Sequence, residues 1–452
     1  MKNDYAVALL LYSNSIGGVD MKVAVIGSGI SGLAAAHRLS GLADLTLLEA
    51  GDYFGGHTHT VDITLDTPTG PRTHGVDTGF LVFNDRTYPQ LIALFTELGV
   101  PSADSDMSFS VQTARNWQDP ALEWCGTSLD AVFAQRSNLL RPRFWRMLLD
   151  VVRFNKLATG LALRNADAEL VQPLGAFLQQ HSFSQEFKDW YFLPMLACIW
   201  SCPTDQMLAF PVATMIRFCH NHGLIALTNR PQWRTVPGGA RHYVEKILAG
   251  IADKRLHAPV QRIDRLADGV LVHVQDQTER FDKVVIATHS DQALSMLADA
   301  SGLERQTLSA IRYQPNHAVL HTDASVLPRR KKAWAAWNYQ RTAGAMNGEN
   351  GPRVCLHYLL NMLQPLPFDQ AVVVSLNPAQ ELDPALVHGR FEYAHPVFDL
   401  AATEAQKRLP AIQGGRHTYF CGAWTGYGFH EDGLKSGLAV ADALKPLLTR
   451  GT

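Results

Sequence analysis

The sequence has almost no net charge, few cysteines and no long apolar run, and each absence excludes a class of protein. Its 40 lysines and arginines nearly balance its 42 aspartates and glutamates, so the formal net charge is −2. This balance excludes the strong positive field with which nucleic-acid-binding proteins attract phosphates. No apolar run approaches the roughly 20 residues of a transmembrane helix. We therefore expect a cytoplasmic protein, in peripheral contact with a membrane at most, whose substrate is a small molecule or a lipid.

The six cysteines are scattered along the chain and form no C-x-x-C pair. This pattern is unlike a zinc ribbon or a disulfide-rich secreted domain, and it fits a reducing compartment. His220 and His222 flank one asparagine beside Cys219, but further ligands at a suitable spacing are missing from the sequence. We therefore predict no metal site.

The length and the changing residue pattern predict two domains. A strand (22–26), a glycine turn, a helix (about 31–40) and a strand (45–49) follow one another near the start, as in a doubly wound α/β sheet. A helical, aromatic-rich region follows, and strand patterns return after the turn VPGGA. We predict a Rossmann-like nucleotide-binding domain from residues 21–100, 236–300 and 411–452, a discontinuous mixed α+β substrate-binding domain from 101–235 and 301–410, and a disordered extension over 1–20, because Met21 directly precedes the first strand.

The stretch VAVIGSGISG, residues 23–32, carries the clearest motif. In the G-x-G-x-x-G spacing, Gly27 permits a tight turn, Gly29 lets the backbone approach a pyrophosphate, and Gly32 lets the following helix pack on the sheet. The helix N-terminus offers N–H groups to the phosphates. Glu49 ends the second strand, where its carboxylate can accept hydrogen bonds from both ribose hydroxyls. These residues together predict a dinucleotide site.

The end of the chain distinguishes a flavin from a nicotinamide. The segments YFCGA and EDGLKSG return to the nucleotide site, and a flavin needs a helix N-terminus there to stabilise negative charge on its ring. With GGHT at 55–58, these stretches resemble the flavin-containing amine oxidase superfamily, which includes monoamine and polyamine oxidases, protoporphyrinogen oxidase and phytoene desaturases. WSCPTDQMLAFP, NHGLIALTNRPQWRTVPGGARHYV and RRKKAWAAWNY are similar, more narrowly, to a bacterial group of FAD proteins often encoded near cyclopropane-fatty-acyl-synthase-like methyltransferases.

The resemblance implies FAD as the cofactor, held without a covalent bond, because Cys421 lies in the last strand while relatives that attach flavin carry their cysteine well before it. It implies the pyrophosphate near the glycine turn, the ribose at Glu49, the adenine at the main chain of Val260, and the ribityl chain and pyrimidine ring at the last helix. The implied cofactor residues are Gly27, Gly29, Ile30, Ser31, Gly32, Glu49, Ala50, Gly55, Gly56, His57, Thr58, Gly79, Phe80, Val260, Gly422, Asp432, Gly433 and Leu434.

Three positions depart from the pattern of these relatives. His57 replaces the usual arginine of G-G-R, Ala423 replaces an acid so that Asp432 is expected to supply its contact, and His430 replaces an aromatic residue at the flavin face. Strand alternation puts Trp337 and Tyr339 on one face, which Tyr358 and Asn361 of a neighbouring predicted strand would join. Packing across the sheet explains these residues equally well. The candidate substrate-pocket residues are Trp337, Tyr339, Tyr358, Asn361, Trp424, Tyr427 and His430.

The stretch RPRFWRMLLDVVRFNKLATGLALR, residues 141–164, reads as a long helix. From Arg136 to Arg164 the chain has seven basic residues and one acid, Asp150. Its apolar side chains, Phe144, Trp145, Leu148, Leu149 and Val152, form a stripe. The simpler interpretation is a solvated basic face over a buried stripe. The alternative is a helix that lies on a membrane surface and helps to take up a lipid.

The sequence thus predicts an FAD-dependent oxidoreductase that moves a hydride from its substrate to flavin N5. We expect an apolar substrate, such as a fatty-acyl chain that undergoes desaturation or a related C–H oxidation. The alternatives are an amine oxidase that releases hydrogen peroxide, a flavin-dependent double-bond isomerase, and an FAD-binding protein without catalysis. No residue is singled out as a catalytic acid or base, and the electron acceptor is not indicated.

Overall fold

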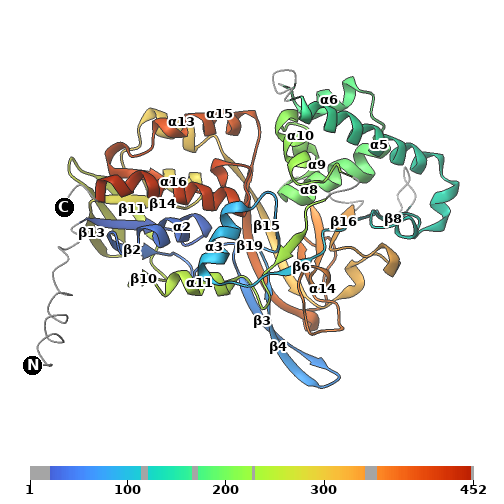
Figure 1. Ribbon diagram of the computed structural model, residues 1–452, viewed down its shortest axis with the longest axis horizontal. Helices are drawn as coiled ribbons and strands as arrows, with labels where there is room; N and C mark the ends of the chain where they lie inside the picture. The colour runs from blue at the N-terminus through green and yellow to red at the C-terminus, as the bar shows by residue number, and fades with distance from the viewer. Residues whose placement is uncertain are drawn as a thin grey trace, which may run out of the picture.

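The computed structural model describes residues 21–113, 121–164, 170, 172–226, 230–341 and 354–448 (Figure 1). The predicted extension over 1–20 lies outside these residues. Figure 1 shows a parallel sheet with α2 and α16 at one end of the long axis, and the helices α5, α6 and α10 at the other end. Among the described helices, none is both long and apolar enough to cross a membrane.

The parallel sheet has the order β10-β2-β1-β14-β20, and every neighbouring pair in it is parallel. Its strands are nearly continuous apolar runs because both faces are covered, one by helices that include α2 and the other mainly by antiparallel strands between residues 260 and 281. Helix α2 follows β1 directly, and α16 packs against α2. The predicted doubly wound fold is confirmed. The elements are β1 (Lys22–Ile26), α2 (Ile30–Leu39), β2 (Asp44–Leu48), β10 (Asp253–Arg255), β14 (Lys283–Ile286), β20 (Thr418–Phe420) and α16 (His430–Leu448).

The second large sheet is mixed, with the order β19-β15-β18-β17-β16-β7-β8. Its strands are β7 (Phe109–Thr113), β8 (Leu122–Cys125), β15 (Arg312–His321), β16 (Trp337–Arg341), β17 (Cys355–Leu359), β18 (Val373–Leu376) and β19 (Val387–Val397). A layer of helices packs beside it: α4 (Leu129–Val132), α5 (Pro142–Leu163), α6 (Leu174–Gln180), α7 (Gln185–Phe187), α8 (Leu193–Trp200), α9 (Thr204–Met207) and α10 (Val212–Asn221).

Smaller elements complete the fold. After β10, the strands β11, β12 and β13 form an antiparallel sheet. After β2, the strands β3 and β4 form a long hairpin. These elements are β3 (Thr60–Thr67), β4 (Gly70–Asp77), β5 (Phe83–Asn84), α3 (Pro89–Leu98), β6 (Ala103–Ser105), β9 (Trp233–Thr235), α11 (Arg241–Leu248), β11 (Val260–Arg265), β12 (Val270–Val274), β13 (Gln277–Phe281), α12 (Ser290–Met296), α13 (Gly302–Leu308), α14 (Leu360–Leu363) and α15 (Leu400–Arg408).

Asp77, at the end of β4, ties three distant segments together. Its carboxylate accepts hydrogen bonds from the Thr60 hydroxyl, from the backbone N–H of Ala240 at 2.9 Å and from the amide of Gln364 at 2.7 Å. Burial raises the pKa of Asp77 to about 7, although these hydrogen bonds lower it in part. Buried hydrogen bonds to Asp77 therefore connect the segments around residues 60, 240 and 364.

Two predictions about local structure are wrong. Helix α5 runs from Pro142 to Leu163, as expected, but Trp145, Leu149 and Val152 on its apolar stripe are exposed by 44%, 70% and 58%. The interpretation of a basic face over a buried stripe fails for these three side chains, whereas Phe144 is buried and Leu148 is half-buried against the core. Asn361 lies in α14 and not in a strand, because the chain turns at Leu360.

Candidate active site

A cavity of about 620 Å³ lies where the carboxyl ends of the parallel strands meet the mixed sheet. Its lining residues come from β1, α2 and the loop after β2 on one side, and from β16, β17, α8 and α10 on the other. A volume of this size is typical of ligand and cofactor sites. The cavity joins a nucleotide end to a substrate end.

The nucleotide end is shaped by backbone that only glycine can provide. Gly27 has a φ of +96°, and a Cβ added there would lie 2.9 Å from the carbonyl oxygen of Ala287. A Cβ added at Gly29 would meet nothing within 4 Å, so open space lies directly in front of this residue. Helix α2 starts here with no side-chain cap and no acid in its first turn. Its N–H groups are therefore available to a phosphate.

Glu49 is fixed by three hydrogen bonds from the glycine-rich loops. One carboxylate oxygen accepts from the Ser28 N–H at 2.9 Å and from the Ser28 hydroxyl at 2.6 Å, and the other accepts from the Gly51 N–H at 2.9 Å. Each carboxylate oxygen can accept more than one hydrogen bond. Glu49 lines the cavity and keeps acceptor capacity for the hydroxyls of a ribose.

His57 leaves a buried ring nitrogen without a partner. Its Nε2 is shielded from solvent, and none of the described protein atoms forms a hydrogen bond with it. The rings of Tyr393 and His395 lie 4.9 Å and 5.3 Å away. Burial holds the pKa of His57 well below its usual value, and His395 and His289 lower it further. An unpaired buried nitrogen costs about 1–3 kcal/mol, and a phosphate oxygen in this cavity would satisfy it. These features fit FAD.

The cavity collects most of the predicted cofactor residues. Those that line it are Gly27, Gly29, Ile30, Ser31, Glu49, Ala50, Gly55, Gly56, His57, Gly79, Phe80, Val260 and Gly422. Gly32 lies behind the turn, where a Cβ would come within 1.9 Å of the Gly27 carbonyl oxygen. Thr58 is also outside the lining, since its hydroxyl pairs with that of Tyr243 at 2.5 Å.

The predicted residues in the first turn of α16 make contacts with the surrounding protein. The carboxylate of Asp432 accepts hydrogen bonds from the N–H groups of Tyr427 and Phe429, each at 3.1 Å, so it holds the preceding loop instead of lining the cavity. Burial raises its pKa to about 6. A Cβ on Gly433 would lie 2.7 Å from the Ile30 side chain, and Leu434 is fully buried, so both residues pack α16 against α2.

Four of the seven predicted substrate residues line the cavity: Trp337, Tyr358, Trp424 and His430. Trp337 and Tyr358 lie opposite each other on β16 and β17, with ring centres 4.9 Å apart. Tyr339 and Tyr427 do not line it. The Asn361 side chain is used elsewhere, because its amide donates to the carbonyl oxygens of Phe368 and Gln370.

Several lining residues could not be identified from the sequence. They are Met107, Ile199, Phe218, His222, Leu224, Trp233, His289, Tyr313 and His395. The aromatic-rich pattern around 185–225 indicated a packed helical region, but a helix pattern does not tell which side chain faces a cavity. His222 was considered only as a metal ligand. Among the described residues, no group of three or more histidine, cysteine or acidic side chains could hold a metal ion.

The geometry of His222 defines which of its nitrogens is free. Its Nδ1 lies 3.0 Å from the Phe218 carbonyl oxygen, which can only accept, so Nδ1 carries the hydrogen and Nε2 keeps a lone pair. The ring stacks on Phe218 at 3.9 Å. Burial lowers the pKa of His222 to about 4, so the ring is neutral at physiological pH. A neutral base therefore lines the substrate end.

The sequence model of the flavin-containing amine oxidoreductase family matches residues 30–344. The chain belongs to this family. FAD is therefore its cofactor, as the glycine motif and the chain end predicted. None of the residues that line the cavity is a cysteine, and burial raises the pKa of Cys421 to about 12, so this thiol is unsuited to bond with a flavin.

Curated relatives share part of this sequence. The protein named as flavin-containing monoamine oxidase AofH of Mycobacterium tuberculosis is 26% identical over 265 residues, which cover 55% of this chain and 53% of that protein. Tryptophan 2-monooxygenase of Pantoea agglomerans pv. gypsophilae is 32% identical over 108 residues, 22% of this chain and 16% of that protein. The chain thus spans about half the length of the first of these curated relatives.

Solved structures match the fold over nearly the whole chain. Cyclohexylamine oxidase from Brevibacterium oxydans has a TM-score of 0.65 and 18% identity, with 95% of this chain and 100% of that one covered. A fatty acid isomerase from P. acnes that produces CLA has a TM-score of 0.60 and 17% identity, with 96% and 99% covered. A putrescine oxidase variant has a TM-score of 0.67 and 15% identity, with 96% and 99% covered. At these identities the likeness shows the fold alone.

Proposed function

We propose that the protein is an FAD-dependent oxidoreductase that oxidises an apolar substrate, a fatty-acyl chain, by desaturation or a related C–H oxidation. One observation carries this proposal: the substrate end of the cavity has no ionised side chain. Among the described residues that line the cavity, Glu49 is the sole carboxylate, it lies at the nucleotide end, and no lysine or arginine is present.

The side chains at the substrate end suit a hydrocarbon. Met107, Ile199, Phe218, Leu224 and Phe429 supply apolar surface, and each buried methylene of a ligand gains about 0.8 kcal/mol. A charged ammonium group here would lose its hydration without an anionic partner in return. The lining therefore favours an acyl chain over a charged amine.

The residues of this chain can support hydrogen removal from such a substrate. The flavin, when bound, accepts a hydride from a substrate carbon. The aromatic walls exclude water and orient the chain, with Trp337 and Tyr358 on one side. Nε2 of His222 has the free lone pair that can accept the proton from the neighbouring carbon. His222 is our candidate for this base.

Two alternatives are supported by the names of relatives. An amine oxidase is favoured by the likeness to cyclohexylamine oxidase and to the protein named AofH, provided that the amine enters uncharged. A double-bond isomerase is favoured by the likeness to a fatty acid isomerase. A protein that binds FAD without catalysis is the remaining alternative.

Anaerobic flavin reduction tests the proposal. The FAD-loaded protein is mixed with palmitoyl and oleoyl esters, with alkylamines of the same chain length and with putrescine, and the flavin absorbance is followed. We expect an acyl ester to bleach the flavin and give an unsaturated product. Bleaching by an amine alone, with hydrogen peroxide on adding oxygen, would identify an amine oxidase. An isomerised ester beside oxidised flavin would identify an isomerase, and no response from any compound would oppose all three activities.

The variant His222→Gln tests the assigned base. Glutamine keeps a polar side chain of similar reach but cannot accept a proton. We expect normal FAD content with much slower bleaching by the ester. His220→Gln is the matched control, because His220 lies two residues away on α10 and does not line the cavity.

A further inference from the structure

One region presents an unusual amount of apolar surface to solvent. In the described parts of the chain, most of the large hydrophobic side chains that are exposed fall between residues 129 and 163. We name this set the outer strip: Leu129 (80% exposed), Leu139 (45%), Leu140 (88%), Trp145 (44%), Leu149 (70%), Val152 (58%) and Leu163 (70%). A patch of this kind marks an interaction surface.

The strip follows one side of α5, which lies at the edge of the molecule (Figure 1). With 3.6 residues per turn, Trp145, Leu149, Val152 and Leu163 share one side of the helix. The buried residues Met147, Phe154 and Ala158 lie on the opposite side, against the remaining helices. The apolar stripe on the outside is therefore additional to the one that packs in the core.

The turn before α5 continues the strip. The indole N–H of Trp145 donates to the carbonyl oxygen of Leu139 at 2.9 Å, and its ring lies 5.3 Å from that of Phe133. Leu140 follows directly and is the most exposed residue of the strip. A large aromatic ring with a polar edge, placed among exposed leucines, is typical of segments that sit at a membrane–water boundary.

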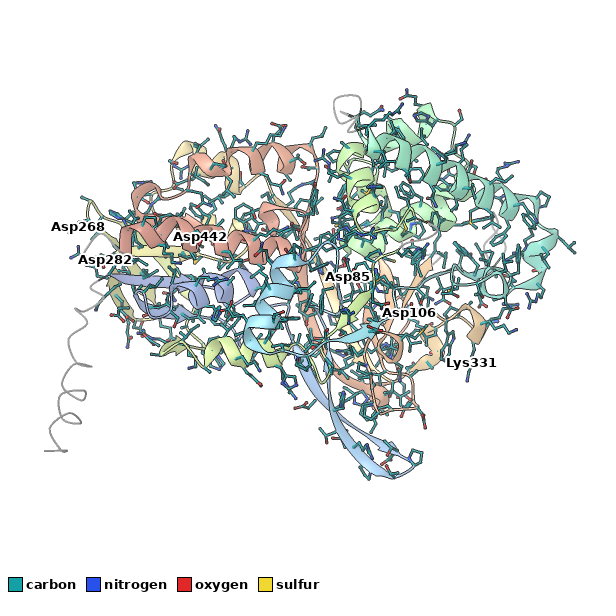
Figure 2. All side chains as sticks on the ribbon, in the orientation of Figure 1. Asp85, Asp106, Asp268, Asp282, Lys331 and Asp442 are labelled. Atoms are coloured by element: carbon teal, nitrogen blue, oxygen red, sulfur yellow. The ribbon has the colours of Figure 1, made fainter. Side chains whose placement is uncertain are left out.

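Positive charge surrounds the outer strip. The side chains of Arg136, Arg143, Arg146 and Arg153 are exposed by 59%, 48%, 64% and 49%. The run RRKK at 329–332 lies beside the start of the strip, because Lys332 and Arg136 both contact Asp130, Lys332 at 2.7 Å. Figure 2 shows Lys331 at the outer edge of the molecule. Acidic partners balance part of this charge: Glu186 contacts Arg143 and Arg146, and Asp150 contacts Arg153. Basic residues remain in excess, since 136–164 and 329–332 together hold eleven.

We propose that the outer strip docks the protein on an anionic lipid bilayer. The exposed leucines and Trp145 enter the boundary region of the bilayer, and the flanking arginines and lysines contact the headgroups. A helix at the edge of the molecule, with an excess of cations around its apolar strip, matches a broad negative surface. It does not match a second copy of itself, since the like charges would repel. Helix α5 packs against α10, whose Phe218 and His222 line the cavity, so docking brings the substrate end near a lipid supply.

Vesicle co-sedimentation of the FAD-loaded protein tests this surface. We use vesicles of phosphatidylcholine alone and of phosphatidylcholine with phosphatidylserine, at low and at high salt. We expect binding to the anionic vesicles that weakens with salt, because screening reduces the attraction. Replacing Arg146, Lys156 and Lys331 together with glutamine should weaken binding roughly fivefold for each charge removed.

Leucine variants separate docking from folding. Leu140→Ser and Leu149→Ser should each weaken binding roughly tenfold, since each removes an apolar side chain that enters the bilayer. Leu303→Ser and Leu400→Ser are matched controls, because these leucines are exposed by 39% and 46% but lie outside the strip. We expect the controls to bind as the wild type does, with unchanged FAD absorbance in all four variants.

Three results would overturn the proposal. They are a wild-type protein that stays in the supernatant at low salt, equal loss of binding in the strip and control variants, and a concentration-dependent dimer that Leu149→Ser abolishes. This test needs no substrate, so it can fail or succeed apart from the proposed function. A protein that binds vesicles but is never reduced by acyl esters would keep the docking surface and lose the substrate.

Discussion

The two ends of the cavity are built in different ways. The nucleotide end consists of backbone turns and one helix N-terminus, with Glu49 and His57 as its main side chains. The substrate end consists of side chains from β16, β17, α8 and α10, which lie far apart in the sequence. Its polar groups are neutral histidines and hydroxyls. The first end therefore depends on local chain geometry, and the second depends on the long-range packing of side chains.

Lowering the pH should have the largest effect on stability, because it protonates buried histidines, and most of those with the lowest pKa values lie in the mixed sheet. Burial lowers the pKa of His222, His321 and His395 to about 4 and that of His357 to about 3. A lowered folded-state pKa stabilises the protein above the unfolded value near 6.5, and this contribution disappears as the pH falls toward 4. Each such histidine costs up to about 1.4 kcal/mol per pH unit in that window. We expect the urea midpoint to fall steeply from pH 7 to pH 5.

Asp77 opposes this trend but cannot reverse it. Its pKa is raised to about 7, so its contribution is complete at acidic pH and is lost as the pH rises through 7. Burial also raises the pKa of Asp432 to about 6 and raises that of Glu431, so these carboxyls act in the same direction as Asp77. The four histidines have the larger summed effect between pH 7 and pH 5. His321 and His357 share the hydroxyl of Ser375 at 2.6 Å and 2.7 Å, an arrangement in which two charged rings would leave its hydrogen without an acceptor. The variant His357→Gln should flatten the pH dependence. A midpoint that is constant or higher at pH 5 would contradict this account.

Two glycines test the nucleotide end. Gly32→Ala places a Cβ within 1.9 Å of the Gly27 carbonyl oxygen, so we expect a loss of about 3 kcal/mol of stability, at the upper end of the cost of overpacking, with loss of FAD. Gly29→Ala has an ordinary φ of −63° and no protein atom near its Cβ. It should keep the stability of the FAD-free protein and bind FAD roughly tenfold or more weakly, because the methyl group enters the phosphate space. Thermal unfolding and flavin fluorescence titration measure both. Normal FAD affinity in Gly29→Ala would mean that the phosphates lie elsewhere.

The contrast between local chain geometry and long-range packing also explains which features could be predicted from the sequence. The bounds of β1, α2 and β2 agree with the expected elements within about two residues, because glycine spacing and apolar runs act locally. Periodicity correctly grouped Trp145, Leu149 and Val152 on one side of a helix but could not tell which side the fold covers. His395 was missed because β19 has the mostly polar pattern of an edge strand, and such a pattern is typical of a loop as well.

Glu49 is the main side chain of the nucleotide end, and its removal should strongly lower the affinity for FAD. Glu49→Ala loses the acceptor for the ribose and for the two loop residues Ser28 and Gly51. A hydrogen bond to a charged group contributes about 1.5–3 kcal/mol, so we expect FAD affinity to fall by roughly tenfold to a hundredfold. Glu245→Ala, exposed on α11, is the control. Equal affinities in both variants would show that the ribose is held by other groups.

The tryptophans Trp337 and Trp334 test the substrate end, and we expect the smallest changes from these variants. Trp337 lines the cavity and its indole nitrogen has no partner among the described atoms, so Trp337→Phe removes surface without breaking a hydrogen bond. Trp334 lies three residues away, outside the cavity lining, where its indole N–H donates to the carbonyl oxygen of Pro328 at 2.7 Å. Trp334→Phe should therefore cost about 1 kcal/mol of stability and leave the flavin spectrum unchanged.

For Trp337→Phe we expect the opposite result, with nearly unchanged stability and weaker substrate binding. Stability should stay within about 0.5 kcal/mol of the wild type, since no hydrogen bond of this residue is lost. The smaller ring lowers contact with the substrate, so the ester concentration for half-maximal flavin reduction should rise roughly fivefold, equivalent to about 1 kcal/mol of apolar contact. The absorbance maximum of bound FAD should also shift, because a ring near the flavin has changed. If Trp334→Phe shifts the spectrum and Trp337→Phe does not, the substrate end lies on the side of Trp334. The residues assigned to the substrate end would then be wrong.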